Sequence, residues 1–212
     1  MNGTRDRGRF ITLEGGEGVG KSTQLQALAA AIRVRGHPVV TTREPGGSPG
    51  AEAIRAMLME GKADRWSPQA EALLFAAARA DHVEKNILPA LERGDWVICD
   101  RFIDSTRAYQ GGAGGLSDVD IMALHCVGSR GLLPDRTLIL KLDTGEASSR
   151  AESRDGGKAD RFALKNNEYH QRVTDSFEDM VLKEPDRFRL VSASGNPSDV
   201  TARLVAALDD LL

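Results

Sequence analysis

A run of small residues near the N-terminus has the spacing of a phosphate-binding loop. The pattern G-x-x-x-x-G-K-[ST] is matched in full by Gly15, Gly16, Glu17, Gly18, Val19, Gly20, Lys21 and Ser22. Glycines let successive backbone N–H groups surround phosphate oxygens without a Cβ in the way. The ammonium of Lys21 can reach the β and γ phosphates, and the hydroxyl of Ser22 can join the shell of a magnesium ion. The loop therefore predicts binding of a nucleoside triphosphate, although it does not select the reaction.

Charged residues also follow two of the later apolar runs. Asp100 and Arg101 close one run, and Arg43 closes another just before a turn rich in Pro and Gly. The carboxyl ends of parallel strands open onto one crevice, so these side chains are expected near the phosphate loop. There, Asp100 could serve magnesium directly or through water, and Arg101 could grip a phosphate in fork geometry. For Arg43, a plain turn with a surface salt bridge is the alternative.

Phe75 and Arg79 lie one helical turn apart in the segment LLFAAAR. They therefore share a helix face, where an aromatic ring and a guanidinium could form a platform for a nucleobase. The alternative is that Phe75 belongs to the core, as a single Phe on an Ala- and Leu-rich helix usually does.

These candidates require strands and helices that alternate along the chain. Apolar runs predict strands at 10–14, 38–42, 96–99, 137–142 and 187–191. Helices are predicted at about 21–35, 50–60, 67–92, 117–128 and 164–183, with a last one from 196 onward, and a Gly-rich loop at 111–115. Strands that are apolar throughout indicate an α/β fold with a parallel sheet covered by helices on both faces.

Composition narrows the classes of protein further. A chain of 212 residues with 41% hydrophobic and 28% charged residues is expected to form one domain, residues 1–212. A net charge of -3 argues against a nucleic-acid partner, and two cysteines are too few for a disulfide framework. We find no apolar stretch that resembles a signal peptide or a membrane helix, so we expect a cytoplasmic protein without a membrane partner.

Taken in order, GGEGVGKST, TREPGG, LLFAAAR, DRF-x2-ST-x2-AYQGG and a late DRF segment resemble the bacterial-type thymidylate kinases over essentially the whole chain. The resemblance implies a P-loop NTPase-type three-layer fold with a five-stranded parallel sheet, a short mobile lid at about 150–161, and a homodimer. It also implies that ATP and magnesium are used to phosphorylate dTMP, giving dTDP for dTTP synthesis.

The resemblance assigns an acceptor pocket residue by residue. Contacts to dTMP are implied for Glu17, Arg43, Pro45, Arg55, Phe75, Arg79, Arg101, Ser105, Tyr109 and Gln110. Phe75 would stack on thymine and Arg79 would bond a thymine carbonyl, while Ser105 and Gln110 would make polar contacts to the base.

The remaining members of this set would hold the sugar and the phosphate. Glu17 would hold the 3'-hydroxyl, and Tyr109 would disfavour a ribose 2'-hydroxyl. The three arginines of the set other than Arg79 would lie near the monophosphate. Pro45 matches a proline that is often cis.

On the donor side, ATP is assigned to residues 15–22 together with Thr23, and magnesium to Ser22 and Asp100. Lys21 and Arg101 are expected to be catalytic, and an arginine of the lid is expected to complete the reaction.

The lid offers Arg154, Arg150 and Arg161, and Arg154 is preferred because it lies beside the pair Gly156-Gly157. Two features depart from the family: Ala163 stands where a Glu is common, and Asp155 follows Arg154. A bland alternative is that these arginines are simply solvated.

Two other functions remain open at this stage. One is another small-molecule P-loop kinase, acting on a different monophosphate or on a deoxynucleoside. The other is a GTP-dependent switch protein, which would need an [NT]-K-x-D motif after a later strand. Residues 61–64 and 157–160 approach that motif, but both begin with Gly, and neither follows an apolar strand directly.

Overall fold

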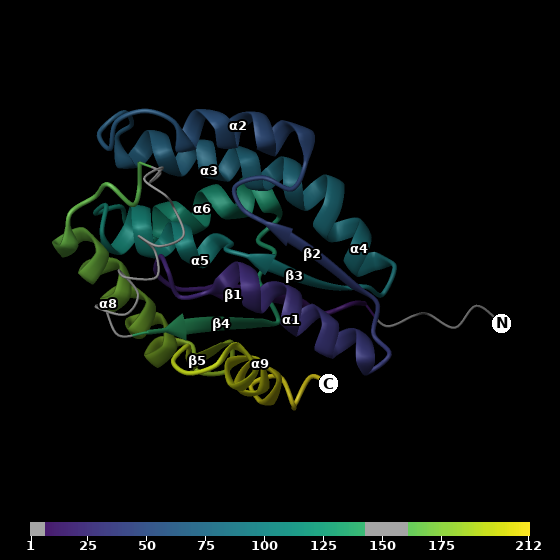
Figure 1. Ribbon diagram of the computed structural model, residues 1–212. Helices are drawn as coiled ribbons and strands as arrows, with labels where there is room; N and C mark the ends of the chain where they lie inside the picture. The colour runs from purple at the N-terminus through teal and green to yellow at the C-terminus, as the bar shows by residue number, and fades with distance from the viewer. Residues whose placement is uncertain (1–6, 143–160) are drawn as a thin grey trace.

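The computed structural model describes residues 7–142 and 161–212. Its centre is a five-stranded sheet with the order β2-β3-β1-β4-β5 (Figure 1). The strands are β1 Phe10–Glu14, β2 Val39–Arg43, β3 Trp96–Asp100, β4 Arg136–Lys141 and β5 Phe188–Ser192. Every neighbouring pair is parallel, which confirms the predicted sheet.

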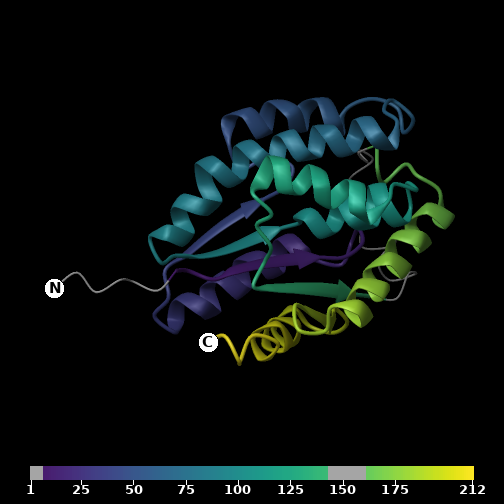
Figure 2. The same ribbon diagram turned by 180° about the vertical axis from the view of Figure 1, so that it is seen from behind.

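Helices cover both faces of the sheet, as Figures 1 and 2 show from opposite sides. The first face carries α1 Lys21–Val34 and α9 Pro197–Ala206. The second carries α3 Pro68–His82, which continues through the π-helical turn η1 Val83–Ile87 into α4 Leu88–Glu92, and also α6 Asp118–Ser129. Outside these layers, α2 Pro49–Met59 packs on α3, and α8 Asn167–Lys183 packs beside β5.

Two apolar clusters hold these layers together. One joins α1 and α9 to the sheet through residues such as Leu28, Ile98 and Leu204. The other joins η1, α4 and α6 to the opposite face through residues such as Phe10 and Ile121. Because both faces are buried at the centre of the sheet, the inner strands β3, β1 and β4 read as largely continuous apolar runs and not as alternating ones.

The predicted Gly-rich loop at 111–115 is wrong in its first two residues. Helix α5 Ile103–Thr106 continues into the π-helical η2 Arg107–Gly112, so both Gly111 and Gly112 are helical. A Cβ on Gly112 would lie 2.5 Å from the Cβ of Ser176 in α8, and one on Gly111 would lie 3.0 Å from Ile121 Cδ1 in α6. These glycines therefore permit close helix packing, a role that the local sequence does not distinguish from a turn.

Helix α5 is tied to the end of β1 by a buried carboxylate. Glu14 is fully buried and accepts hydrogen bonds from the backbone N–H of Phe102 (2.7 Å) and from Ser105 Oγ (2.6 Å). On its other side, α5 carries Asp104, also fully buried, which accepts bonds from Arg187 at 2.6 and 3.0 Å. Helix α5 is thus fastened both to β1 and to the start of β5.

The two carboxyls of this junction titrate differently. Burial, together with the nearby charge of Asp104, raises the pKa of Glu14 to about 7. Burial also opposes the charge of Asp104, but hydrogen bonds from Arg187 hold the pKa of Asp104 below its usual range.

Glu14→Gln should remove a pH dependence of stability. The pKa of Glu14 rises from 4.5 to about 7 on folding, so the folded chain binds the extra proton between these values, and stability falls as pH rises through them. A Gln side chain can accept from Phe102 and donate to Ser105, but it does not titrate. Relative to wild type, the unfolding free energy of the variant should therefore gain roughly 2–3 kcal/mol between pH 5 and pH 8.

Urea denaturation across this pH range measures the difference. Glu178→Gln, at a half-exposed side chain on α8 that pairs with Lys141, is the control and should show little change. If the unfolding free energy of Glu14→Gln depends on pH in the same way as that of wild type, the raised pKa of Glu14 is contradicted.

Candidate active site

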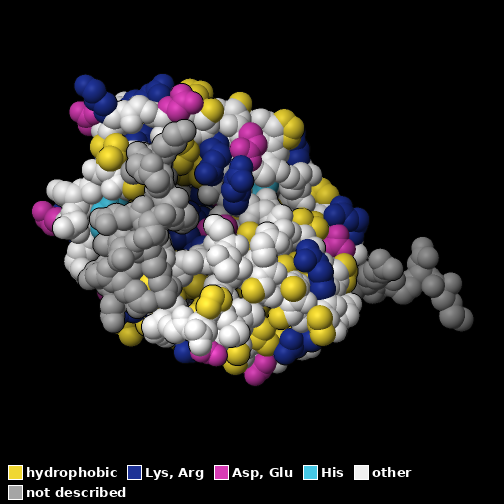
Figure 3. All heavy atoms as spheres, viewed as in Figure 1, with side chains coloured by type: hydrophobic (Ala, Val, Ile, Leu, Met, Phe, Trp, Pro, Cys, Tyr) yellow, Lys and Arg dark blue, Asp and Glu magenta, His cyan; other side chains and the backbone are white. Residues whose placement is uncertain are grey.

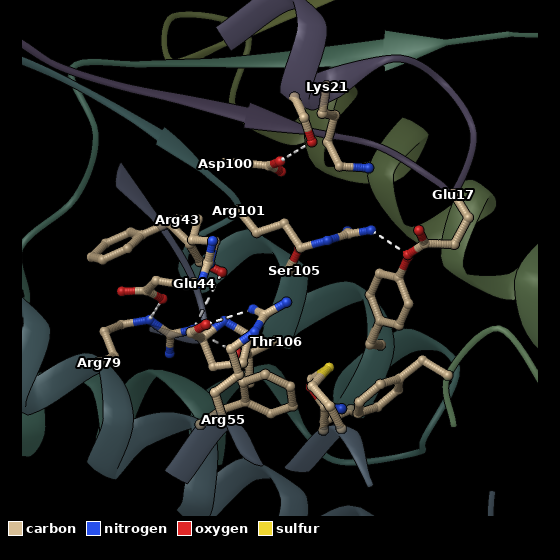
Figure 4. Close-up of a pocket in the computed structure, with 18 of the residues that line it drawn as sticks. Glu17, Lys21, Arg43, Glu44, Arg55, Arg79, Asp100, Arg101, Ser105 and Thr106 are labelled. Carbon is tan, nitrogen blue, oxygen red and sulfur yellow. Dashed lines mark hydrogen bonds and ion pairs between the residues drawn. The ribbon is translucent and has the colours of Figure 1, made fainter. Parts of the chain in front are cut away.

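A cavity of about 360 Å³ opens at the carboxyl ends of the strands. Ligand pockets of this size hold small molecules. The cavity is lined by the phosphate loop, the β2–α2 connection, α2, α3 and the segment from β3 to η2 (Figure 4). Figure 3 shows Lys and Arg side chains gathered around a hollow on this face. The crevice therefore has the location and the charge expected for an anionic ligand.

The phosphate loop joins β1 to α1 in a shape that requires glycine. Gly15 has φ 127°, and a Cβ there would lie 2.4 Å from the carbonyl oxygen of Leu140. Gly20 has φ 88° and caps the N-terminus of α1. Both conformations are rarely open to other residues. The loop thus brings the positive end of the α1 dipole to the cavity.

Lys21 is the cation of this loop. It is 8% exposed, and its Nζ donates to the carbonyl oxygens of Gly15 (3.2 Å) and Gly16 (2.6 Å). Burial lowers the pKa of Lys21 to about 8, and the positive charge of Arg101 contributes to the shift. The ammonium is held only by neutral carbonyls in these bonds, so a phosphate can replace them with stronger, charge-assisted partners.

Ser22 and Asp100 lie together as the sequence predicts for a metal site. Ser22 Oγ donates to Asp100 Oδ2 at 3.3 Å, while Asp100 Oδ1 is buried without a hydrogen-bond partner among the described residues. Such an orphaned oxygen needs a ligand. In the described part of the chain no cluster of three or more His, Cys, Asp or Glu could hold a metal. The pair therefore fits magnesium, which takes one or two protein groups and completes its shell with phosphates and water.

Arg101 links the phosphate loop to the rest of the cavity. Its φ of 70° is left-handed, which costs a non-glycine residue roughly 1–2 kcal/mol. Its guanidinium donates to the carbonyl oxygen of Gly15 (3.0 Å), to Ser105 Oγ (3.2 Å) and to Glu17 Oε1 (2.5 Å). It also lies 5.1 Å from the centre of the Tyr109 ring. The structure thus brings together four residues that the sequence placed in one pocket.

Strand β2 and helix α2 supply one further arginine each. Arg43 pairs with the exposed Glu52 at 3.1 Å and also lines the cavity. It therefore has both the surface salt bridge and the position at the crevice that the sequence left as alternatives. Nη1 of Arg55 donates to the carbonyl oxygen of Pro45 at 2.6 Å. The peptide bond between Glu44 and Pro45 is cis, which confirms the expectation for this proline.

Arg79 is held by a buried partner that the sequence analysis missed. Its Nε donates to Glu44 Oε2 at 2.7 Å, and its Nη2 donates to the Phe102 carbonyl oxygen (3.3 Å) and to Thr106 Oγ1 (3.0 Å). The other oxygen of Glu44 contacts Nδ1 of the fully buried His82 at 3.1 Å. The only sequence signal for Glu44 was its place in TREPGG beside the expected arginine.

Aromatic rings form the wall opposite these charges. Phe75 is half-buried, lines the cavity, and packs on Phe162 with ring centres 5.8 Å apart. Tyr109 meets the same Phe162 edge to face at 6.3 Å, and its carbonyl oxygen accepts a bond from the Tyr169 hydroxyl at 2.9 Å. Phe75 thus packs against a core cluster and also lines the cavity. Phe162 was missed, although it stands in the DRF segment.

The lid arginines divide into two groups. Arg150 and Arg154 lie outside the described residues. Arg161 is 1% exposed and forms an ion pair with Glu71. Its guanidinium also donates to carbonyl oxygens at the C-terminal end of α2 and in the connection that follows it. An arginine so placed cannot reach over a nucleotide, so its candidacy as a lid arginine is wrong. It anchors the start of the described segment 161–212 to α2 and α3.

Comparison with known proteins places the chain in a family. The profile of the thymidylate kinase family matches residues 13–204. A thymidylate kinase from Rhizorhabdus wittichii is 60% identical over 205 residues, covering 97% of this chain and 99% of the relative. One from Caulobacter vibrioides is 50% identical over 200 residues, covering 93% of this chain and 94% of the relative.

The fold agrees with these similarities. The crystal structure of a thymidylate kinase from Ehrlichia chaffeensis superposes with a TM-score of 0.78 at 32% identity, covering 96% of this chain and all of that one. The phosphate loop and the similarity over nearly the whole chain point to the same family. The chain belongs to the thymidylate kinase family.

Proposed function

We propose that this chain transfers the γ-phosphoryl group of ATP to dTMP, giving ADP and dTDP for dTTP synthesis. The observation that carries the proposal is a single cavity with a triphosphate loop at one end and an aromatic wall at the other, bridged by Arg101. A monophosphate bound at the wall would present its oxygen in line with the γ-phosphorus of a triphosphate at the loop. Catalysis would then come from positioning and from stabilising negative charge.

The residues on the donor side would act through charge. Lys21 would exchange its loop carbonyls for oxygens of the β and γ phosphates, and Arg101 would neutralise charge between the two substrates. Ser22 and Asp100 would hold the magnesium ion, which offsets negative charge on the phosphates when it is bound.

The residues on the acceptor side would select the nucleotide. Phe75 would stack on thymine, which is worth about 1–3 kcal/mol in comparable complexes. Glu17 would hold the 3'-hydroxyl, and the Tyr109 ring would occupy the space of a ribose 2'-hydroxyl. Arg43 and Arg55 would hold the monophosphate from the β2–α2 side.

The alternatives have less support. Other monophosphates remain possible acceptors, and an acceptor screen separates them. A GTP-dependent switch lacks support in the described segment 61–64, because the carbonyls of Lys62 and Ala63 accept from Arg161 and so serve packing. Residues 157–160 lie outside the described part.

Within the described residues no helix is long and apolar enough to span a membrane. We propose that the enzyme works in the cytoplasm, with its nucleotide substrates.

The exposed apolar surface of α3 and α6 fits a second copy of this chain. These helices lie side by side (Figures 1 and 2). Leu73 and Ala77 of α3 and Val119, Ala123 and Val127 of α6 are all exposed, with spacings of four residues that place each set on one helix face. Exposed apolar patches of this kind mark interaction sites, and most soluble oligomers are symmetric homodimers. We therefore propose that the enzyme is a homodimer through this face.

Lys21→Ala should abolish most activity without unfolding the chain. Loss of the ammonium removes charge stabilisation from the transferring group, which lowers kcat by roughly 100-fold or more in comparable sites. A coupled assay with ATP and a panel of monophosphates, dTMP, dUMP, dCMP and dGMP, measures the rates, and dTMP should give the highest kcat/KM. Lys85→Ala, at a half-exposed ion pair with Asp81, is the control. A folded Lys21→Ala enzyme with normal turnover would disprove the assignment.

Arg154→Ala should lower kcat strongly while leaving dTMP affinity nearly unchanged. A cationic fork that contacts the transferring phosphoryl group is worth roughly 10³-fold in other enzymes, and such a contact would form only in the closed complex. Arg150→Ala tests the second candidate, and Arg172→Ala, an exposed pair on α8, is the control. If Arg154→Ala and Arg150→Ala each leave kcat within a factor of about three, catalysis does not depend on these arginines.

Val127→Asp should convert dimers into monomers. The side chain is 88% exposed in one copy, and burying a charge in an apolar contact is unfavourable. Light scattering after size-exclusion chromatography measures the mass. Val34→Asp, at a residue 87% exposed on α1, is a matched control on the other side of the sheet and should not change it. A wild-type protein that is monomeric at micromolar concentration would rule the dimer out.

A further inference from the structure

A buried acidic residue joins the cavity to the chain after residue 160. Glu71, in the first turn of α3, is 3% exposed. Its Oε2 accepts a hydrogen bond from Nε2 of Gln110 at 2.9 Å, and its Oε1 accepts one from Nη2 of Arg161 at 2.5 Å. Gln110 lines the cavity, whereas neither Glu71 nor Arg161 does.

Arg161 keeps this carboxylate charged. Its guanidinium is buried and permanently protonated, so a neutral Glu71 would leave it without a counter-charge. Three carbonyl oxygens, of Leu58, Lys62 and Ala63, accept further hydrogen bonds from Arg161 and hold it in place. Arg161 is therefore a fixed positive charge behind Glu71.

An ionised carboxylate dictates which way the amide of Gln110 points. A carboxylate can only accept hydrogen bonds, so Gln110 must turn its NH2 group toward Glu71. Its Oε1 then points the other way and has no hydrogen-bond partner among the described residues. The orientation follows from the charge of Glu71, because the two ends of an amide have nearly the same shape. Gln110 thus offers the cavity a hydrogen-bond acceptor.

An acceptor at this position distinguishes between pyrimidines. N3 of thymine and of uracil carries a hydrogen, whereas N3 of cytosine is an acceptor. Two acceptors placed face to face leave both unsatisfied, and sites that require a hydrogen bond reject ligands that cannot make it.

We propose that Glu71, held ionised by Arg161, is a positioning residue that fixes the Gln110 amide so that Oε1 accepts from N3–H of the base. Through this relay the site selects thymine over cytosine. The inference rests on the proposed function, since it takes the base of dTMP as the group in the cavity.

Glu71→Gln tests the relay. A neutral amide at position 71 can either accept from or donate to Gln110, so the Gln110 amide is free to turn over. We expect kcat/KM for dTMP to fall about threefold to tenfold, the range of one neutral hydrogen bond, mainly through KM. The ratio of kcat/KM for dTMP to that for dCMP should fall by a similar factor. The ratio for dTMP to dUMP should not change, because both bases carry N3–H.

Two further variants separate positioning from a merely structural role. Arg161→Lys keeps the positive charge and disturbs the same junction, so it should lower Tm but leave the dTMP to dCMP ratio as in wild type. In a Gln110→Ala background, Glu71→Gln should have no further effect on that ratio. If Glu71→Gln does not fold, the double variant Glu71→Gln, Arg161→Met removes both buried charges and carries the same measurement.

The outcomes are distinct from those that test the function itself. A wild-type enzyme that does not phosphorylate dTMP refutes the proposed function, and calorimetry of dTMP, dUMP and dCMP binding then tests the relay alone. An unchanged dTMP to dCMP ratio in Glu71→Gln overturns the relay. The relay is also overturned if Glu71→Gln lowers the dTMP to dCMP ratio equally in the Gln110→Ala background. It is overturned as well if Arg161→Lys lowers that ratio as much as Glu71→Gln does.

Discussion

The carboxylate of Glu14 sits fully buried where β1 ends and the phosphate loop begins, and buried carboxylates need hydrogen-bond donors. Its donors are the backbone of Phe102, in the turn that follows β3, and the hydroxyl of Ser105, in α5. That turn is therefore held against the phosphate loop, and Arg101, at its start, takes a left-handed conformation with its guanidinium on Gly15 and Glu17. The distance between the phosphate loop and the segment after β3 depends on this contact.

Other buried carboxylates are also held by donors from distant parts of the chain. Glu44 pairs with Arg79, Glu71 with Arg161 and Asp104 with Arg187, and each pair joins segments far apart in the chain. Replacing such a pair by apolar residues is often neutral for stability, whereas removing one partner is costly. Their value here lies in geometry: each fixes the direction of a side chain or a turn that borders the cavity. Apolar packing alone would hold the layers together without orienting these polar groups.

The sequence predicted those features that depend on residues close together in the chain. Strands buried on both faces and amphipathic helices carry their own periodicity, and the phosphate loop has a fixed spacing. The residues expected to contact dTMP were assigned from the resemblance to a family and not from periodicity. Glycines gave a misleading signal at Gly111 and Gly112, because the reason for them is close packing against α6 and α8.

The buried carboxylates were missed for a related reason. Glu14, Glu44 and Glu71 look like surface residues in the sequence, and only their distant donors make them part of the site. Arg161 was assigned to the lid because it follows a polar stretch rich in arginine. Its burial depends on Glu71 and on carbonyls at the end of α2, none of which is near it in the chain.

The cations of the cavity already have partners before any ligand enters. Lys21 rests on two carbonyls, Arg101 on Glu17, and Arg43 on Glu52. A phosphate must displace or share these partners, so its binding energy is a difference between old contacts and new ones. The exchange is most favourable at Lys21, where neutral carbonyls give way to charged oxygens. It is least favourable at Arg101, whose carboxylate partner Glu17 is more buried than the partner of Arg43. In the proposed complex, discrimination of the base would depend on a different kind of group, because Gln110 Oε1 is an acceptor with no partner among the described residues. Affinity for the phosphates and selection of the base would then be governed by separate groups, which can be altered independently.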